Sequence, residues 1–139
     1  MSVNTKPIGV AYEDQNIIGA DKIYSSSEFG YTVDAQGAVT QLTSKATAVT
    51  LNKSAGRITL NNAALAGNTA VSFTLNNTFI SNNDILILNV SGGSVADATT
   101  YTAYTSSLTT GAAVITLRNL TAVSQSEAVI INYAIIHCV

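Results

Sequence analysis

Hydrophobic and polar residues alternate in short runs along most of the chain after residue 38. Ile58 and Leu60 lie on either side of Thr59, and residues 71–76 and 115–118 repeat the pattern. Such alternation is typical of a strand with one buried face, because successive side chains point to opposite sides. About eight runs of this kind, separated by Gly, Asn, Ser and Asp, predict an all-β sandwich or barrel.

One connection between these runs has the composition of a tight turn. Residues 52–56 read NKSAG and separate the run at 49–51 from the run at 57–60. The pattern predicts a β-hairpin, with Gly56 available for a positive φ. No segment of the chain predicts a long helix.

Two runs break the alternation and are apolar at nearly every position. They read DILILNV at residues 84–90 and EAVIINYAII at residues 127–136. Strands of this kind are covered on both faces, and a two-layer sandwich covers only one. The second face then needs the N-terminal segment, a loop or a neighbouring subunit. The residues predicted to lie in an interface, or else in the core, are Ile85, Leu86, Ile87, Leu88, Val129, Ile131, Tyr133 and Ile135.

The first 35 residues differ from the rest of the chain. They hold half of the charged residues and the only proline, and their apolar positions show no sustained period. We therefore expect an extended N-terminal arm at 1–35, with one short strand at Phe29–Val33, followed by the sandwich at 36–139. The apolar clusters IGVAY and NIIGA favour an arm that packs against a partner over a free tail. The predicted contact residues of the arm are Pro7, Ile8, Tyr12, Ile17, Ile18 and Tyr24.

Charge is scarce. Charged residues make up 10% of the chain, against about 25% in a typical soluble domain. The net charge is −2 and no run of Lys or Arg occurs, so nucleic acid is not an expected partner. The chain shows no signal-peptide pattern and no apolar stretch of membrane-spanning length, so neither export nor a membrane is expected. Thr, Ser and Asn occupy the outward positions and suit a low-charge surface that faces other proteins.

Catalytic and metal-binding patterns are missing from the sequence. The single histidine, His137, precedes the single cysteine, Cys138, and neighbours on a strand point to opposite faces, which disfavours a Cys–His pair. The only adjacent acids are Glu13 and Asp14. We expect no enzyme activity, no catalytic residue, no metal site and no cofactor.

Several short motifs occur in a recognisable order. They read TSKATAVTLN from Thr43, GRITLNNAAL from Gly56, VSFTLNN from Val71, DILILNVSGG from Asp84, LRN from Leu117 and SEAVIINYAII from Ser126. In this order they resemble small structural proteins of tailed bacteriophages, in particular the capsid decoration (cement) proteins. The resemblance covers about two thirds of the chain, from residue 40 to the end.

This resemblance implies a fold, partners and a location. The fold would be a jelly-roll-like β-sandwich of about eight antiparallel strands. The partners would be the major capsid protein of an HK97-type shell and further copies of the chain, as a homodimer or homotrimer. The protein would be made in the host cytoplasm, would bind the outer surface of the capsid in the virion, and would stabilise contacts between capsomers.

Two other functions stay open. Similar sequences also occur on tail and fibre components, so the chain is alternatively a tail-fibre or baseplate module that contacts host-surface glycans. A free carbohydrate-binding module is a third possibility. The absence of Trp counts against it, and Tyr101 and Tyr104 are three positions apart, which places them on opposite faces of a strand rather than in one platform.

Overall fold

A computed structural model of the chain describes residues 21–22, 24–91 and 100–138. The chain divides into two units, Met1–Gly30 and Tyr31–Val139. Of the residues predicted to form the arm contact, Tyr24 lies within the described ranges, where its side chain is 84% exposed. The other five, which lie outside the described residues, are Pro7, Ile8, Tyr12, Ile17 and Ile18.

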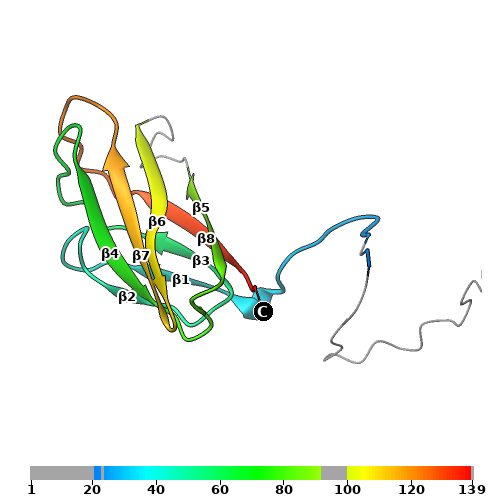
Figure 1. Cartoon of the computed structure of the whole chain (residues 1–139). Helices are drawn as coiled ribbons and strands as arrows, with labels where there is room; N and C mark the ends of the chain where they lie inside the picture. Colours follow the sequence, from blue (N-terminus) through cyan, green and yellow to red (C-terminus); the bar gives the residue numbers. More distant parts are fainter. Residues whose placement is uncertain (1–20, 23, 92–99, 139) are drawn as a thin grey trace, which may run out of the picture. The chain divides into compact units, whose positions relative to one another are not determined.

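The second unit is a sandwich of two four-stranded sheets (Figure 1). Sheet A has the strand order β1-β3-β8-β5, and sheet B has the order β2-β4-β7-β6. This confirms the predicted all-β sandwich. The strands are β1 (Gln36–Thr40), β2 (Val49–Thr50), β3 (Ala55–Thr59), β4 (Ala70–Asn76), β5 (Ile85–Ser91), β6 (Tyr101–Thr109), β7 (Ala112–Asn119) and β8 (Ile130–Ile136).

Two strand pairs are parallel, which corrects the expectation of an all-antiparallel jelly roll. β1 pairs with β3, and β2 pairs with β4, each in parallel, while the remaining neighbours are antiparallel. The first four strands alternate between the sheets, so every second strand returns to the same sheet in the same direction. Parallel neighbours need such a crossover connection, and here the crossover is a strand of the opposite sheet.

The same alternation removes the predicted hairpin at residues 52–56. This segment leads from β2 in sheet B to β3 in sheet A, and Gly56 belongs to β3 without a positive φ. A tight hairpin occurs instead between β6 and β7, where Thr109 pairs with Ala112 and Gly111 has a φ of 85°. The prediction failed because turn composition does not reveal whether a chain reverses within one sheet or crosses to another.

The segment before β1 is not the predicted strand. Residues 29–32 are irregular, and Val33–Ala35 form a single turn of 3₁₀ helix. The Tyr31 hydroxyl donates a hydrogen bond to the carbonyl of Ile135 in β8. The Ile135 N–H donates to Ser54 at 2.9 Å, so Ile135 pairs with groups beyond the end of β3. Residues 29–32 therefore contact β8 through the side chain of Tyr31 and not as a paired strand.

Inward-facing aliphatic residues of both sheets form the core. Each fully buried aliphatic side chain contributes about 1.5–3 kcal/mol relative to an exposed one. The sheets therefore associate through the faces that the alternation predicts. The core residues that are 0% exposed are Ile58, Leu75, Ile115, Leu117, Val129, Ile131 and Ile135.

Buried amides hold the loops at the two ends of the sandwich. Asn119 is 0% exposed, and its Nδ2 donates to the carbonyls of Leu65 at 3.0 Å and Val123 at 2.9 Å. At the other end, Asn77 is 1% exposed and its Nδ2 donates to the carbonyl of Lys53 at 2.7 Å. Each amide thus hydrogen-bonds inside the fold, as buried polar groups generally do, and joins segments that are distant in sequence.

Lys45 is also buried, at 3% exposure. Its ammonium group donates to the carbonyls of Asn61 at 2.5 Å and Glu127 at 2.6 Å. Burial lowers the pKa of Lys45, and the negative charge of Glu127 partly opposes this effect. The lysine thus fastens the loop after β1 to the segment before β8.

Candidate interaction surface

The outer face of sheet B is covered by hydroxyl groups. Ser72 of β4, Thr116 of β7 and Ser106 of β6 form a row, with oxygen–oxygen distances of 2.8 and 2.9 Å. On β4 and β7 the neighbours of these residues along the strand point into the core. Tyr101 is 2% exposed and Tyr104 is 48% exposed, which confirms that the two tyrosines lie on opposite faces.

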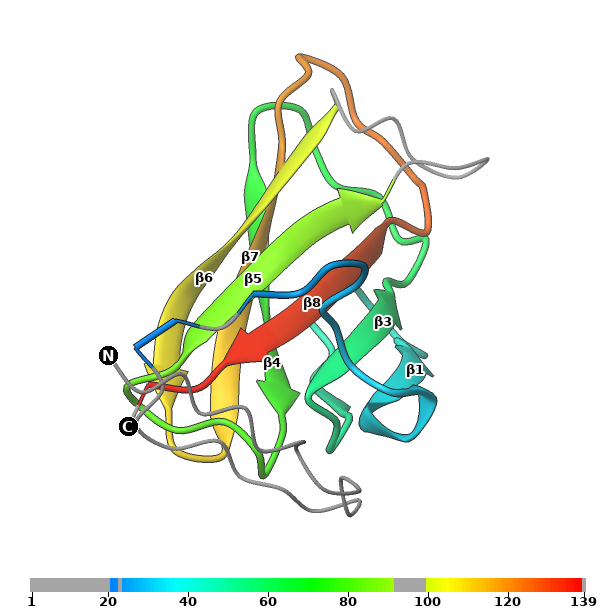
Figure 2. The same ribbon diagram turned by 90° about the vertical axis from the view of Figure 1, so that its right-hand side faces the viewer.

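Figure 2 shows the strands of sheet A in front of those of sheet B. The outer face of sheet A has a different chemical character. Ile85 and Ile87 of β5 are 54% and 49% exposed, and Ile136 of β8 is 48% exposed. The strand register places Ile85 opposite Ile136, and Ile87 opposite Ala134. These four residues form one apolar strip over β5 and β8, here called the isoleucine strip.

The two strands predicted to be apolar on both faces differ in how they are covered. The inward residues of β8 and of the segment before it are core, between 0% and 4% exposed: Val129, Ile131, Tyr133 and Ile135. On β5, Leu86 and Leu88 pack against the core and are partly buried. Ile85 and Ile87 point outward and stay about half exposed within the described part of the chain, so they are the members of the predicted set that an interface can use.

A hollow of about 350 Å³ lies beside the isoleucine strip. Four of its lining residues, Gln36, Ala55, Arg57 and Asn132, occupy outward positions on β1, β3 and β8. Ala55 contributes only a methyl group to this part of the outer face. Sequence reasoning missed this hollow, since it depends on the register between three strands that are distant in sequence.

Arg57 contributes a positive charge to the outer face of sheet A. It is exposed, and it has no hydrogen-bond or ion-pair partner among the residues that the structure describes. The register places Arg57 between Ala38 of β1 and Asn132 of β8. An arginine beside apolar surface can bind a carboxylate through two parallel hydrogen bonds.

A smaller hollow, of about 250 Å³, opens between the edge strands β5 and β6. It is lined by Leu88, Asn89 and Val90 on one side and by residues 101–103 on the other. Burial and the negative charge of Glu127 raise the pKa of Tyr101 to about 12. The tyrosine is therefore neutral at physiological pH.

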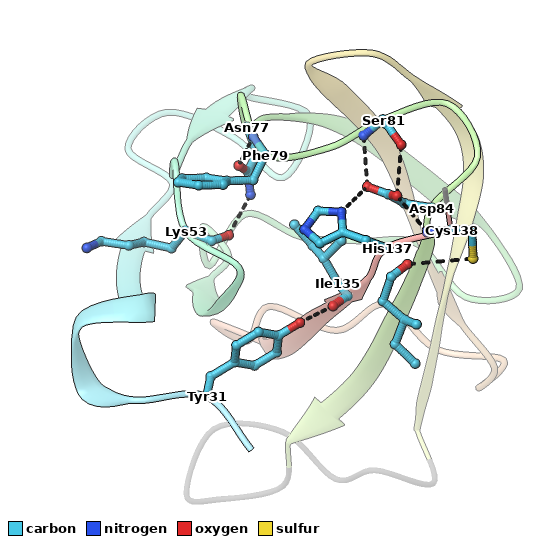
Figure 3. A network of polar contacts seen from close by, with 10 residues as sticks. Tyr31, Lys53, Asn77, Phe79, Ser81, Asp84, Ile135, His137 and Cys138 are labelled. Atoms are coloured by element: carbon cyan, nitrogen blue, oxygen red, sulfur yellow. Dashed lines mark hydrogen bonds and ion pairs between the residues drawn. The ribbon is translucent and has the colours of Figure 1, made fainter. Parts of the chain in front are cut away.

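Asp84 organises the end of the sandwich where β5 starts and β8 finishes (Figure 3). Its carboxylate accepts bonds from the backbone N–H and the hydroxyl of Ser81, each at 2.8 Å, and from the backbone N–H of Cys138 at 3.2 Å. His137 Nδ1 lies 3.0 Å from Asp84 Oδ2. These bonds, led by that from the Ser81 backbone, lower the pKa of Asp84 to about 2.

His137 and Cys138 are arranged around this carboxylate and not around each other. The Cys138 thiol is exposed and lies 4.0 Å from the carbonyl of Ile136. Both residues therefore join the C-terminal segment to the start of β5. In the sequence Asp84 stands out as a single acid directly before an apolar strand. Sequence reasoning did not identify this aspartate as the partner of His137.

In residues 21–22, 24–91 and 100–138 no cluster of three or more potential metal ligands occurs. None of the described helical turns is long or apolar enough to cross a bilayer. Comparisons with protein-family models, curated proteins and solved structures find no match to this chain.

Proposed function

We propose that this chain is a structural protein of a tailed-phage virion, a decoration protein that binds the outside of an HK97-type capsid. It would contact the major capsid protein and further copies of itself, and would stabilise contacts between capsomers. The observation that carries the proposal is the contrast between the two outer faces. One is covered by hydroxyl groups, and the other presents an isoleucine strip beside an unpaired arginine.

The two faces suit a protein that exposes one face to solvent and binds a partner with the other. The hydroxyl groups of the Ser72–Thr116–Ser106 row keep the outer face of sheet B polar although it carries little charge. The isoleucine strip offers apolar area that a specific interface buries. A contact that depends mainly on apolar burial would change little with salt.

The positions of the resemblance motifs in the fold support the proposal in a second way. Four polar residues of those motifs are buried: Lys45, Asn77, Asp84 and Asn119 are 3%, 1%, 8% and 0% exposed. They fasten loops to the sandwich, so sequences that share these motifs are expected to share this fold. The proposed role in the virion follows from the same resemblance to decoration proteins.

Quantitative mass spectrometry of purified virions tests the proposal. Isotope-labelled peptides of this chain and of the major capsid protein would give the copy number of each. A copy number comparable with that of the capsid protein supports a decoration protein. A few copies per particle would overturn it in favour of a tail-fibre or baseplate module.

Particle binding can be examined with the purified chain. Deletion of residues 1–25 is expected to leave a folded β-protein that no longer binds capsids, because the predicted contact residues Pro7, Ile8, Tyr12, Ile17, Ile18 and Tyr24 are lost. Far-UV circular dichroism checks folding. Full binding by the truncated chain would contradict a role for the arm, and release of the intact chain by high salt alone would contradict a mainly apolar contact.

A further inference from the structure

The charge on the outer face of sheet A has no partner in the described part of the chain. Arg57 lies two strands from the exposed edge strand β5, with β8 between them. Arg57 is opposite Asn132, and Asn132 is opposite Asn89, so Ile87 lies two strands across and two residues along from Arg57. With strands about 4.8 Å apart and a rise of about 3.4 Å per residue, the two positions are about 12 Å apart. A ligand of this face therefore needs a negative group and an aliphatic group at about that separation.

The chain itself contains a sequence with this spacing. Residues 8–18 read IGVAYEDQNII and include Glu13 and Asp14, the only adjacent pair of acids in the chain. Val10 precedes Asp14 by four residues, and Ile17 follows Glu13 by four. In an extended chain residues four apart point to the same side, and at about 3.3 Å per residue they are about 13 Å apart.

We propose that the outer face of sheet A binds residues 8–18 of a second copy of the chain. Arg57 pairs with the Glu13–Asp14 carboxylates at the hollow, and the isoleucine strip packs against the flanking aliphatic side chains. Charge complementarity selects this occupant, because an acidic pair enclosed by apolar residues matches a single cation beside an apolar strip. The exchange is reciprocal in a dimer and cyclic in a trimer, since each copy offers both a segment and a face.

This inference does not rest on the proposed function, since it concerns the purified chain without any particle. Binding of the segment to its own chain, or binding of a different protein to Arg57, is an outcome that the experiments below distinguish.

Charge reversal tests the pairing. The dissociation constant of the self-associated full chain would be measured by sedimentation velocity at low and moderate salt. Arg57→Glu alone and the pair Glu13→Arg and Asp14→Arg are each expected to weaken association about tenfold or more. All three changes in one chain are expected to restore association.

Matched controls separate this effect from a general charge effect. Arg118 of β7 is exposed on the outer face of sheet B, so Arg118→Glu is expected to leave association unchanged. Asp21→Arg with Glu28→Arg removes two acids outside the segment. Undiminished association of Arg57→Glu, or equal losses in the control variants, would overturn the pairing.

Zero-length crosslinking identifies the contacting atoms and the chain that supplies them. Arg57→Lys keeps the charge and supplies an amine, which a carbodiimide joins to a nearby carboxylate with loss of water. Equal amounts of ¹⁵N-labelled and unlabelled full chain would be mixed, crosslinked and digested. Mixed-isotope peptides joining residue 57 to residue 13 or 14 support the proposal. Crosslinks within single chains only, or none to these residues, would overturn it.

Discussion

The Nδ1 atom of His137 lies 3.0 Å from the Oδ2 atom of Asp84, at the point where the C-terminal segment meets the start of β5. Asp84 also binds Ser81 and the backbone of Cys138. Asp84→Ala is expected to lower the midpoint of thermal unfolding more than His137→Ala does. The aspartate bonds four groups, whereas the histidine contributes one of them. Differential scanning calorimetry of both variants checks this order, and equal midpoints would contradict it.

The acid stability of the protein should depend on the same carboxylate. Its pKa falls from an ordinary value of 3.8 to about 2 in the folded chain. A group with a lowered folded pKa stabilises the fold above its unfolded pKa, and this contribution is lost as the pH falls through the folded value. Urea unfolding from pH 7 downward should therefore show a constant difference between the native protein and Asp84→Ala above about pH 4. That difference should shrink toward pH 2; a constant difference down to pH 2 would refute the assignment.

Asn119→Ala removes a buried amide that binds the carbonyls of Leu65 and Val123. We expect the free energy of unfolding to fall by about 3 kcal/mol, because the hydrogen bonds that fasten these loops to β7 are lost and each contributes about 1 kcal/mol. Asn76 is exposed on the outer face of sheet B, and Asn76→Ala should change stability by less than about 0.5 kcal/mol. Chemical denaturation measures both values, and similar losses in the two variants would contradict the structural role of Asn119.

Ile135 and Ile136 are neighbours on β8 with opposite environments, at 0% and 48% exposure. Ile135→Ala should reduce the free energy of unfolding by about 2–5 kcal/mol, as expected for a cavity in a packed core. Ile136→Ala should cost less than about 1 kcal/mol, because the residue faces outward. Urea unfolding of the two variants compares them directly. A reversed order would mean that the outward face of β8 is buried in solution.

Gly56→Ala places a methyl group in occupied space. Its Cβ would lie 2.6 Å from Leu51 Cδ2 and 2.7 Å from Tyr133 Cε1. Tyr133 cannot easily move away, since its hydroxyl lies between the carbonyl oxygens of Leu51 and Lys53, at 3.2 and 3.0 Å, and shares its one proton with them. We expect a loss of about 1–3 kcal/mol in the free energy of unfolding. Gly30→Ala, with no atom within 4 Å of the added carbon, serves as the control.

Side-chain alternation predicted which residues of a strand face inward, because that property depends only on neighbours in sequence. Ile58, Phe73 and Ile115 are all in the core. Alternation does not say which sheet a strand joins, so the parallel pairs and the crossing at residues 52–56 were not predicted. The same turn residues are compatible with a hairpin within one sheet and with a connection from one sheet to the other.

The polar contacts were harder to predict than the strands. Asn119 lies at the end of a strand and resembles any surface amide in the sequence, and only the approach of distant loops buries it. The hollow beside Arg57 depends on the register of β1, β3 and β8. The isoleucine strip was partly visible, since residues 84–90 are apolar on both faces, although the sequence did not separate the outward Ile85 from the inward Leu86.

The position of β8 within sheet A has a consequence for synthesis. β8 pairs with β3 on one side and β5 on the other, so neither strand has its central partner until β8 has left the ribosome. Non-local pairing of this kind slows folding and leaves apolar strands exposed in the meantime. The nascent chain would carry an unpaired β5 with the sequence ILILNVS and would depend on chaperones or rapid completion to avoid aggregation.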